Sequence, residues 1–559
     1  MGKLGKRSRL LALLLALALV FVAGCQAVAG VDFNAVLKKA LKVTSSEGNQ
    51  TLELKLLLDE EALAEMPEED QELIKLFTSI KLKLDQVKLQ DEEHMSMNGS
   101  LQLGDEIGIG FSLQMSDTLA VLELEGAKQP FVLDLTSESL LGAAAGINTE
   151  EADGLDDESL TALGHEALDT IGAYVIDNLP NPERIQVKPA VEPVNGSATS
   201  LMHVHAYLNG PEIWALVKKY VDALVADREG FESMIEGVFD ILQRNPDVWE
   251  AIGSVNPFEE GGLDAPTPEE LKEQAAEELF VMLEDLQAEL ARMDDEDQEV
   301  IEEMFSKDLV IKADMYVDSK LDIRKQLYEL TYVPSEEETD QAAEENVGNE
   351  ADPDVEYFDE QFGYGFAYGI GAMPFKGITI KLESEAWNVN GAVVADAPAE
   401  TDDAFSAEAL FEMQGYQFLK HFDESSDIYD LLKNKFHIAN QTVTWYPYDE
   451  YNPAILTAAG ITIIPLRDTA DSLGASIEYN AKSKGIKLYD EATDTTVSVK
   501  IGSDKAVVNG KTETWSFPVT LVDGVSYVPA RDLARVLRAK ISWSEFYDDE
   551  KIFTLEREL

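Results

Sequence analysis

Two histidines, His203 and His205, are the residues of this chain whose types and spacing could bind a metal ion. They lie in an alternating segment, residues 200–208, which predicts a strand, so both imidazoles would project from one face. No third ligand follows at a spacing typical of metal-binding sequences. We therefore interpret the pair as partly exposed strand residues and predict no metal site and no cofactor.

Sequence motifs for catalysis are missing as well. The chain has 107 Asp and Glu residues, so neighbouring carboxylates arise from composition alone and do not indicate acid–base catalysis. We find no nucleophile elbow, phosphate loop, dinucleotide fingerprint or calcium loop. The sequence predicts no catalytic residue and a protein that is not an enzyme. A hydrolase with a scattered, unrecognised active site is the alternative.

The N-terminus has the three parts of a secretion signal. A basic segment, residues 3–9, precedes an uncharged apolar run, residues 10–22, which is shorter than the roughly 20 residues of a membrane span. Small residues follow, and then Cys25, the only cysteine of the chain. Segment 22–25 (VAGC) resembles the bacterial lipobox, which implies removal of residues 1–24 and attachment of lipid to Cys25. An ordinary secretory signal or an uncleaved anchor is the alternative.

The charge of the chain restricts its partners. The formal net charge is −63, and loss of the four cations in residues 1–24 takes it to −67. Nucleic acid is excluded as a partner, because phosphate binding needs clustered Lys and Arg. Anionic headgroups would also repel the chain, so the lipid on Cys25 must supply its membrane affinity. We expect a lipid-anchored protein on the extracytoplasmic face of the bacterial cell membrane.

Alternating apolar and polar residues predict an antiparallel sheet over much of the chain. The predicted strands are 51–58, 80–89, 95–103, 107–115, 119–125, 130–135, 200–208, 307–317, 321–333 and 376–384. Helical spacing predicts helices at 32–43, 211–226, 230–243 and 268–305. We predict an α+β fold that is mostly antiparallel β: a curved half-barrel sheet with a helical insertion, followed by a small C-terminal repeat domain of strands and short helices.

This order of elements resembles the half-barrel of bacterial lipoprotein-carrier and glycolipid-binding lipoproteins. The resemblance is one of pattern, without a signature motif. It implies a concave apolar face that takes up acyl chains, and so a hydrophobic ligand as an alternative partner. The other interpretation is that the helices fill this face as core.

An internal repeat occupies the C-terminal hundred residues and becomes visible when the chain is shifted by 64 positions. Segment 463–479 (IIPLRDTADSLGASIEY) then aligns with segment 527–543 (YVPARDLARVLRAKISW). In each copy a strand ends at a proline and a short amphipathic helix begins. The motif residues are Pro465, Arg467, Leu473 and Gly474 in the first copy and Pro529, Arg531 and Leu537 in the second.

The repeat resembles the copper amine oxidase N-terminal domain, a stalk module with a V-P-x-R helix start and a helix ending in L-G-A. Residues 473–475 keep this ending, whereas residues 537–539 read Leu-Arg-Ala. The resemblance covers residues 456–559 and implies a non-catalytic spacer or adhesion element. The copper- and quinone-bearing core of the oxidases has no counterpart here. We expect Arg467 and Arg531 to cap and brace the repeat.

The predicted domain plan has five parts. These are the signal peptide, 1–24; the lipidated N-terminus and first helix, 25–48; a half-barrel-like domain, 49–385, with a helical insertion at about 211–305 and an acidic linker at about 334–354; a connecting region, 386–455, with a helix at 404–420; and the stalk domain, 456–559. The predicted function is non-catalytic binding or support at the cell surface, with a hydrophobic ligand or a cell-wall or surface partner.

Overall fold

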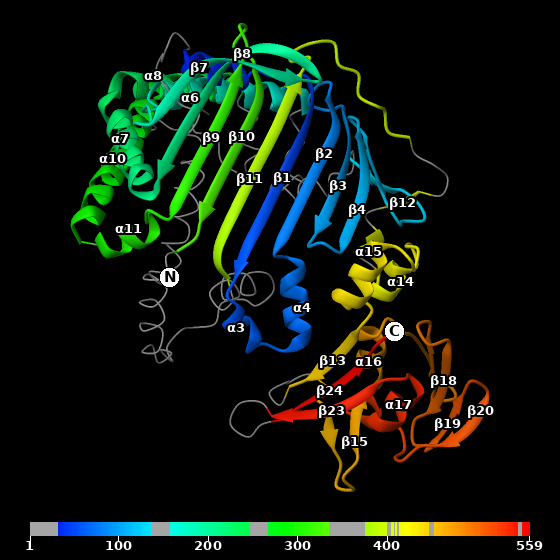
Figure 1. The fold of residues 1–559 in the computed structure, drawn as a ribbon. Helices are drawn as coiled ribbons and strands as arrows, with labels where there is room; N and C mark the ends of the chain where they lie inside the picture. The colour runs from blue at the N-terminus through cyan, green and yellow to red at the C-terminus, as the bar shows by residue number, and fades with distance from the viewer. Residues whose placement is uncertain are drawn as a thin grey trace. The chain divides into compact units, whose positions relative to one another are not determined.

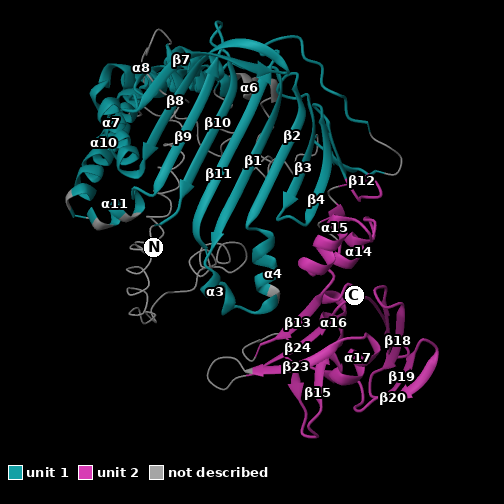
Figure 2. Ribbon diagram, viewed as in Figure 1, with its two compact units in different colours: residues 1–124, 130–404 teal, residues 125–129, 405–559 magenta. Residues whose placement is uncertain are grey.

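The protein forms two compact units, which Figure 2 shows in different colours. The computed structural model describes residues 32–135, 157–245, 267–296, 298–334, 375–399, 404–406, 409–410, 413–446, 452–545 and 551–559. Unit 1 comprises residues 1–124 and 130–404, and unit 2 comprises residues 125–129 and 405–559. The predicted connecting region is therefore divided between the two units.

Two of the predicted features, Cys25 and most of the acidic linker, lie outside the described residues. Among the described helices, none is both long and apolar enough to cross a membrane.

Unit 1 is built on one curved antiparallel sheet (Figure 1). Its strands, in chain order, are β1 (Ser46–Leu58), β2 (Ser79–Leu89), β3 (Met95–Leu103), β4 (Ile107–Met115), β5 (Leu119–Leu124), β6 (Phe131–Asp134), β7 (Ile185–Val194), β8 (Ser197–Asn209), β9 (Leu309–Val317), β10 (Ile323–Tyr332) and β11 (Phe375–Trp387). Within the unit the order across the sheet is β6-β5-β4-β3-β2-β1-β11-β10-β9-β8-β7. The predicted half-barrel with a helical insertion is confirmed.

Strand β7 is the element of this sheet that the sequence did not predict. Its sequence contains Pro189 and Pro193, and proline cannot donate a hydrogen bond to a neighbouring strand. In the structure β7 pairs with β8 and lies at the end of the sheet order. Proline is tolerated there because one side of an edge strand needs no partner.

The described helices of unit 1 occur in four places along the chain. They are α2 (Phe33–Ala40); α3 (Glu60–Ala64) and α4 (Glu68–Leu76) between β1 and β2; α6 (Asp157–Asp177) before β7; and α7 (Gly210–Ala226), α8 (Arg228–Arg244), α10 (Pro268–Glu296) and α11 (Gln298–Met304) between β8 and β9. The last group is the predicted insertion. Helices α3, α4 and α6 were not predicted.

The insertion begins with a capping box at the end of β8. The Asn209 side chain accepts a hydrogen bond from the Glu212 backbone N–H, and the Glu212 carboxylate accepts one from the Asn209 N–H. Both interactions satisfy amide groups that the first turn of a helix leaves without partners. The chain therefore changes from strand to helix at the point where the sequence places Asn, Gly and Pro.

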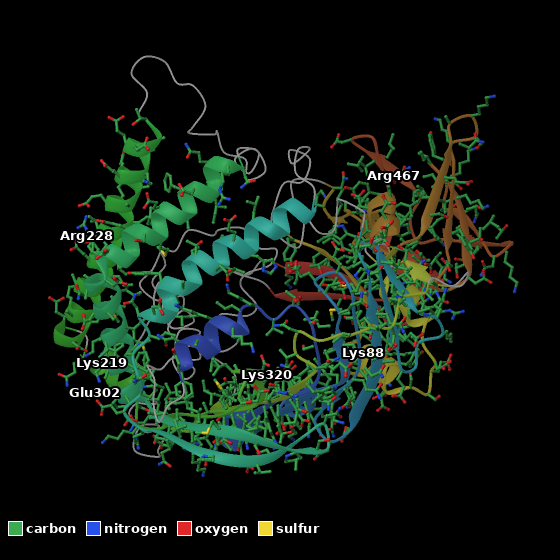
Figure 3. The ribbon with its side chains drawn as sticks, turned by 90° about the horizontal axis from the view of Figure 1, so that it is seen from above. Lys88, Lys219, Arg228, Glu302, Lys320 and Arg467 are labelled. Atoms are coloured by element: carbon green, nitrogen blue, oxygen red, sulfur yellow. The ribbon has the colours of Figure 1, made fainter. Side chains whose placement is uncertain are left out.

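Helices α7 and α10 cover one face of the sheet at its β8–β10 end. Ala206, Ile311, Ala313 and Leu330 project from these strands into a buried cluster with residues of α7, including Val217. The sheet curves toward this helical side (Figure 3). Burial of one face and hydration of the other explains the strict alternation of β9, in which every second residue is buried.

Unit 2 contains short helices and three small antiparallel sheets. Its elements are β12 (Phe405–Ser406), α14 (Gly415–Leu419), α15 (Asp427–Asp430), the π-helical turn η3 (Leu431–Lys435), β13 (Gln441–Trp445), β14 (Ile455–Leu456), β15 (Thr462–Pro465), α16 (Leu466–Ser472), β16 (Ser476–Asn480), β17 (Gly485–Asp490), β18 (Thr495–Lys500), β19 (Lys505–Val508), β20 (Lys511–Thr514), β21 (Thr520–Val522), β22 (Val525–Pro529), α17 (Ala530–Val536), β23 (Lys540–Glu545) and β24 (Lys551–Arg557).

The predicted helix at 404–420 is wrong in extent. Among the described residues of this segment, the structure has strand β12 at its start, a 3-10 turn at 409–410 and α-helix from Gly415, after Gln414 in an extended conformation. The Gln414 backbone N–H donates to the Gln417 side chain at 3.0 Å, and this contact caps the start of the short helix. A Cβ on Gly415 would lie 1.7 Å from the Ile438 carbonyl oxygen, so the backbone here packs tightly against a distant part of the chain. This tertiary contact sets the start of the helix, and it cannot be predicted from helical periodicity in the sequence.

Replacement of Ile311 by Ala should destabilise unit 1 by about 2–5 kcal/mol, because it removes buried methyl groups and leaves a cavity under α7. Urea denaturation of the full chain measures the loss. The control is Val191→Ala on β7, which is 67% exposed and should change stability by less than about 0.5 kcal/mol. Equal losses in the two variants would contradict the proposed core.

Candidate ligand-binding face and repeat module

The helical side of the sheet continues as an apolar face beyond the helices. Strand register shows this in one row of cross-strand neighbours. From β9 to β4 the row consists of Ala313, Tyr328, Leu382, Leu52, Leu82, Leu101 and Ile109. Because side chains directly opposite one another project to the same side, this row is a stripe across the concave face.

Coverage of this stripe changes along its length. At the β10 end Tyr328 packs against the helical cluster, and burial raises the pKa of its phenol to about 12. At β1, however, Leu52 is 39% exposed, and Leu82 and Leu101 on the next strands are half-buried. The face from β1 to β3 therefore has the apolar character that an acyl chain needs, with side chains that solvent still reaches.

The convex face of the same strands is charged. A second cross-strand row alternates in sign from β9 to β2 and consists of Lys312, Glu329, Lys381, Glu53 and Lys81. Glu329 accepts from Lys312 at 2.8 Å and pairs with Lys381 at 3.2 Å, and these contacts hold the pKa of its carboxyl below the usual range. Burial of an apolar ligand on this face would break these pairs. The concave face is thus the candidate site for such a ligand.

The histidine pair lies on the convex side of β8, opposite β9. Register places His205 beside Asp314 and His203 beside Tyr316. The Asp314 Oδ1 atom lies 2.5 Å from His203 Nε2 and 2.8 Å from His205 Nδ1. The acidic partner that the sequence did not indicate comes from a strand 109 positions further along the chain. The sequence signal that could have indicated Asp314 is its position in β9, where the alternation places it on the outward side of the strand.

In unit 2 the two repeat copies meet at strands β15 and β22. Ile464 pairs with Val528, its counterpart 64 positions later, and Pro465 pairs with Tyr527, the counterpart of Ile463. Equivalent residues therefore lie opposite one another, as a local two-fold axis between the copies requires. Pro465 and Pro529 then cap helices α16 and α17, which both bury their leucine and alanine side chains in one common core.

Residues 443–548 match the copper amine oxidase N-terminal domain. This module is the non-catalytic N-terminal part of that family, and the match spans under a fifth of the chain. It begins within β13 and extends past β23, so it includes both repeat copies. Comparison with curated proteins and comparison with solved structures each gave no match. The C-terminal part of the chain is therefore similar to a non-catalytic module.

The helices of the copper amine oxidase N-terminal-like module end at equivalent leucines, Leu473 and Leu537. The next residues have positive φ angles, +68° at Gly474 and +57° at Arg538. Glycine adopts this left-handed conformation without a steric penalty, whereas arginine does so at a cost. The second copy, which has Arg538 in place of the glycine, therefore forms a turn of the same backbone conformation, but that turn is strained.

A buried guanidinium joins the ends of both helices. Arg557, at the end of β24, donates to Asp490 at 2.7 and 2.9 Å and to the Leu473 and Leu537 carbonyls at 3.2 and 3.4 Å. It also donates to Gln441 at 2.6 Å. Both side chains of the ion pair are almost fully buried, at 0% and 1% exposure. A positive charge is favourable at a helix C-terminus, and here one charge serves two helices.

The motif arginines lie on the surface of the module. Within the residues that the structure describes, neither Arg467 nor Arg531 has a hydrogen-bond or ion-pair partner. The residues that follow them make the contacts instead: Asp468 accepts from Asn452 at 2.7 Å, and Asp532 accepts from the Ser516 backbone N–H at 2.8 Å. These aspartates occupy equivalent positions in the two repeat copies, and each connects the start of its helix to a neighbouring loop.

Replacement of Arg557 by Met should destabilise the module by about 3–5 kcal/mol, because Asp490 would remain as a buried, uncompensated charge. The measurement is urea denaturation of the full chain, monitored by tryptophan fluorescence. Arg535→Met is the matched control: Arg535 is 55% exposed, and loss of its pair with Glu513 should cost about 0–1 kcal/mol. A loss below 1 kcal/mol in Arg557→Met would contradict the role of the buried pair.

Replacement of Arg538 by Gly should stabilise the module by about 0.5–1 kcal/mol, because glycine relieves the left-handed backbone strain. The midpoint of thermal unfolding should rise accordingly. Arg538→Ala separates this effect from loss of charge, since alanine keeps the Cβ atom and should give no gain. If both variants behaved alike, the strain at this turn would not be the cause.

Proposed function

We propose that this chain is a lipid-anchored, non-catalytic protein of the bacterial cell surface, with its C-terminal module as a spacer or adhesion element. The observation that carries the proposal is the match of residues 443–548, which include both repeat copies, to a non-catalytic module. The lipobox-like segment ending at Cys25 supports a lipid anchor. The strong negative charge supports a role in which acyl chains, not headgroup attraction, provide membrane affinity.

Replacement of Cys25 by Ala tests the anchor. The full chain, expressed in a bacterium, should enter the detergent phase of a Triton X-114 extraction, and its mass should correspond to a lipidated chain that begins at Cys25. The Cys25→Ala variant should lack the acyl mass, because no thiol remains to accept lipid. Val28→Ala, three positions after the motif, is the matched control and should behave as wild type. An unmodified Cys25 in the full chain would refute the lipid anchor.

A second function, carriage of an apolar ligand, is favoured by the exposure of Leu52 on the concave face. The apolar stripe extends from the helical cluster across β1 to β4, where several leucines are only half-buried. A lipid acyl chain or another hydrophobic ligand fits this chemistry. Such a carrier needs no catalytic residue, so this function agrees with the prediction that the protein is not an enzyme.

Native mass spectrometry of the chain without its signal peptide and with Cys25 replaced tests the carrier. After incubation with a fluorescent fatty acid, it should retain one discrete added mass that organic extraction removes. Leu52→Gln should weaken binding by about tenfold, because it places an amide in the apolar stripe. Leu57→Gln is the matched control. Leu57 is on the same strand and is 44% exposed, but the alternation of β1 places it on the convex face.

Retention of no lipid by the wild type would exclude the carrier and leave the spacer or adhesion function. Equal weakening by Leu52→Gln and Leu57→Gln would indicate binding that does not use the concave face.

A further inference from the structure

Asp314 differs from the other acidic residues on the convex face of unit 1. In the charged row beside it, Glu329 pairs with two lysines, and Glu53 pairs with Lys55 at 2.7 Å. The partners of Asp314 are instead two imidazoles, His203 and His205, on the adjacent strand. Three side chains that ligate transition metals thus meet at one place on two hydrogen-bonded strands.

The ligand atoms of these three residues are close enough to share one ion. Each offers one atom, and the three atoms all lie within 4.8 Å of one another. Around an ion with bonds of about 2.0–2.2 Å, tetrahedral ligand atoms are about 3.3–3.6 Å apart. Small side-chain rotations of His203 or His205 would therefore complete the site without movement of the strands. Both rings contact the same Oδ1 atom, and an ion would replace this atom as their common partner.

The surroundings hold the cluster and leave one side open. The ring of Tyr316 stacks on His203 with centroids 4.4 Å apart and planes 4° from parallel, which fixes the orientation of that imidazole. His203 is 11% exposed, whereas His205 is 36% exposed, so an ion can enter from the His205 side. Two cations lie nearby. Lys188, opposite His203 on β7, is exposed and can turn into solvent. Lys312, two residues before Asp314 on β9, pairs with Glu329 at 2.8 Å.

We propose that His203, His205 and Asp314 form a binding site for a first-row divalent transition-metal ion on the convex face of unit 1. Two imidazole nitrogens and one carboxylate oxygen are a donor set suited to Zn²⁺, Cu²⁺, Ni²⁺ or Fe²⁺ and poorly suited to Mg²⁺ or Ca²⁺. Three protein ligands leave at least one coordination position for water or for a donor from a partner. The site links β8 to β9 and is separate from the apolar concave face.

Isothermal titration of the full mature chain with Zn²⁺ tests this site. The buffer contains about 0.15 M NaCl and an excess of Mg²⁺, so that weak binding to the acidic surface is suppressed. We expect one tight equivalent and a rise in the unfolding temperature that EDTA reverses. Asp314→Asn, which keeps the shape of the side chain, and His205→Gln should each weaken this equivalent at least about tenfold and abolish the temperature rise.

The matched control is His94→Gln, because His94 Nδ1 lies 2.8 Å from Asp91 in an exposed pair that is not part of the three-residue cluster. This variant should bind Zn²⁺ as the wild type does. The circular dichroism of each variant checks its fold. No tight equivalent in the wild type, or an unchanged one in folded Asp314→Asn and His205→Gln, would overturn the metal site and leave a hydrogen-bonded cluster that joins two strands.

Discussion

The architecture of unit 1 depends on one constraint: a sheet with a single apolar face must hide that face. The alternation of β1 to β4 and of β8 to β11 places leucine, isoleucine and valine on one side, and hydration of the other side keeps the lysine and glutamate pairs there. Curvature of the sheet and the insertion between β8 and β9 follow from this requirement, since helices α7 and α10 bury the stripe where they reach it. Where they do not, Leu52 remains 39% exposed, and it is there that we propose an apolar ligand binds.

Unit 2 meets a different constraint, because each repeat copy is too small to bury a core alone. The copies share one core across the β15–β22 pair, and their helix ends converge on a single buried guanidinium, that of Arg557. Such a charge is tolerated only with a close counter-charge and filled hydrogen bonds, and Asp490 and Gln441 supply both. A module held in this way suits a spacer, since its parts cannot separate without exposing an ion pair.

The two faces of one sheet thus offer two kinds of chemistry. The concave side presents apolar surface, and the convex side presents charges together with the cluster of His203, His205 and Asp314. Strand geometry is what separates them, because successive side chains point to opposite sides. A hydrophobic ligand and a metal ion could therefore bind the same strands without competing for the same atoms.

The sequence by itself determined the features that depend on neighbours along the chain. Alternation located β3 and β4 to the residue, and the repeat located the caps at Pro465 and Pro529, because strand period and helix starts are local properties. Tertiary structure alone decided the rest. An edge position made β7 possible despite its prolines, packing shortened the helix expected at 404–420, and pairing across more than a hundred residues brought Asp314 to His205 and Arg557 to Gln441. A single sequence does not predict such contacts, because which residues become neighbours depends on which strands pair in the folded sheets.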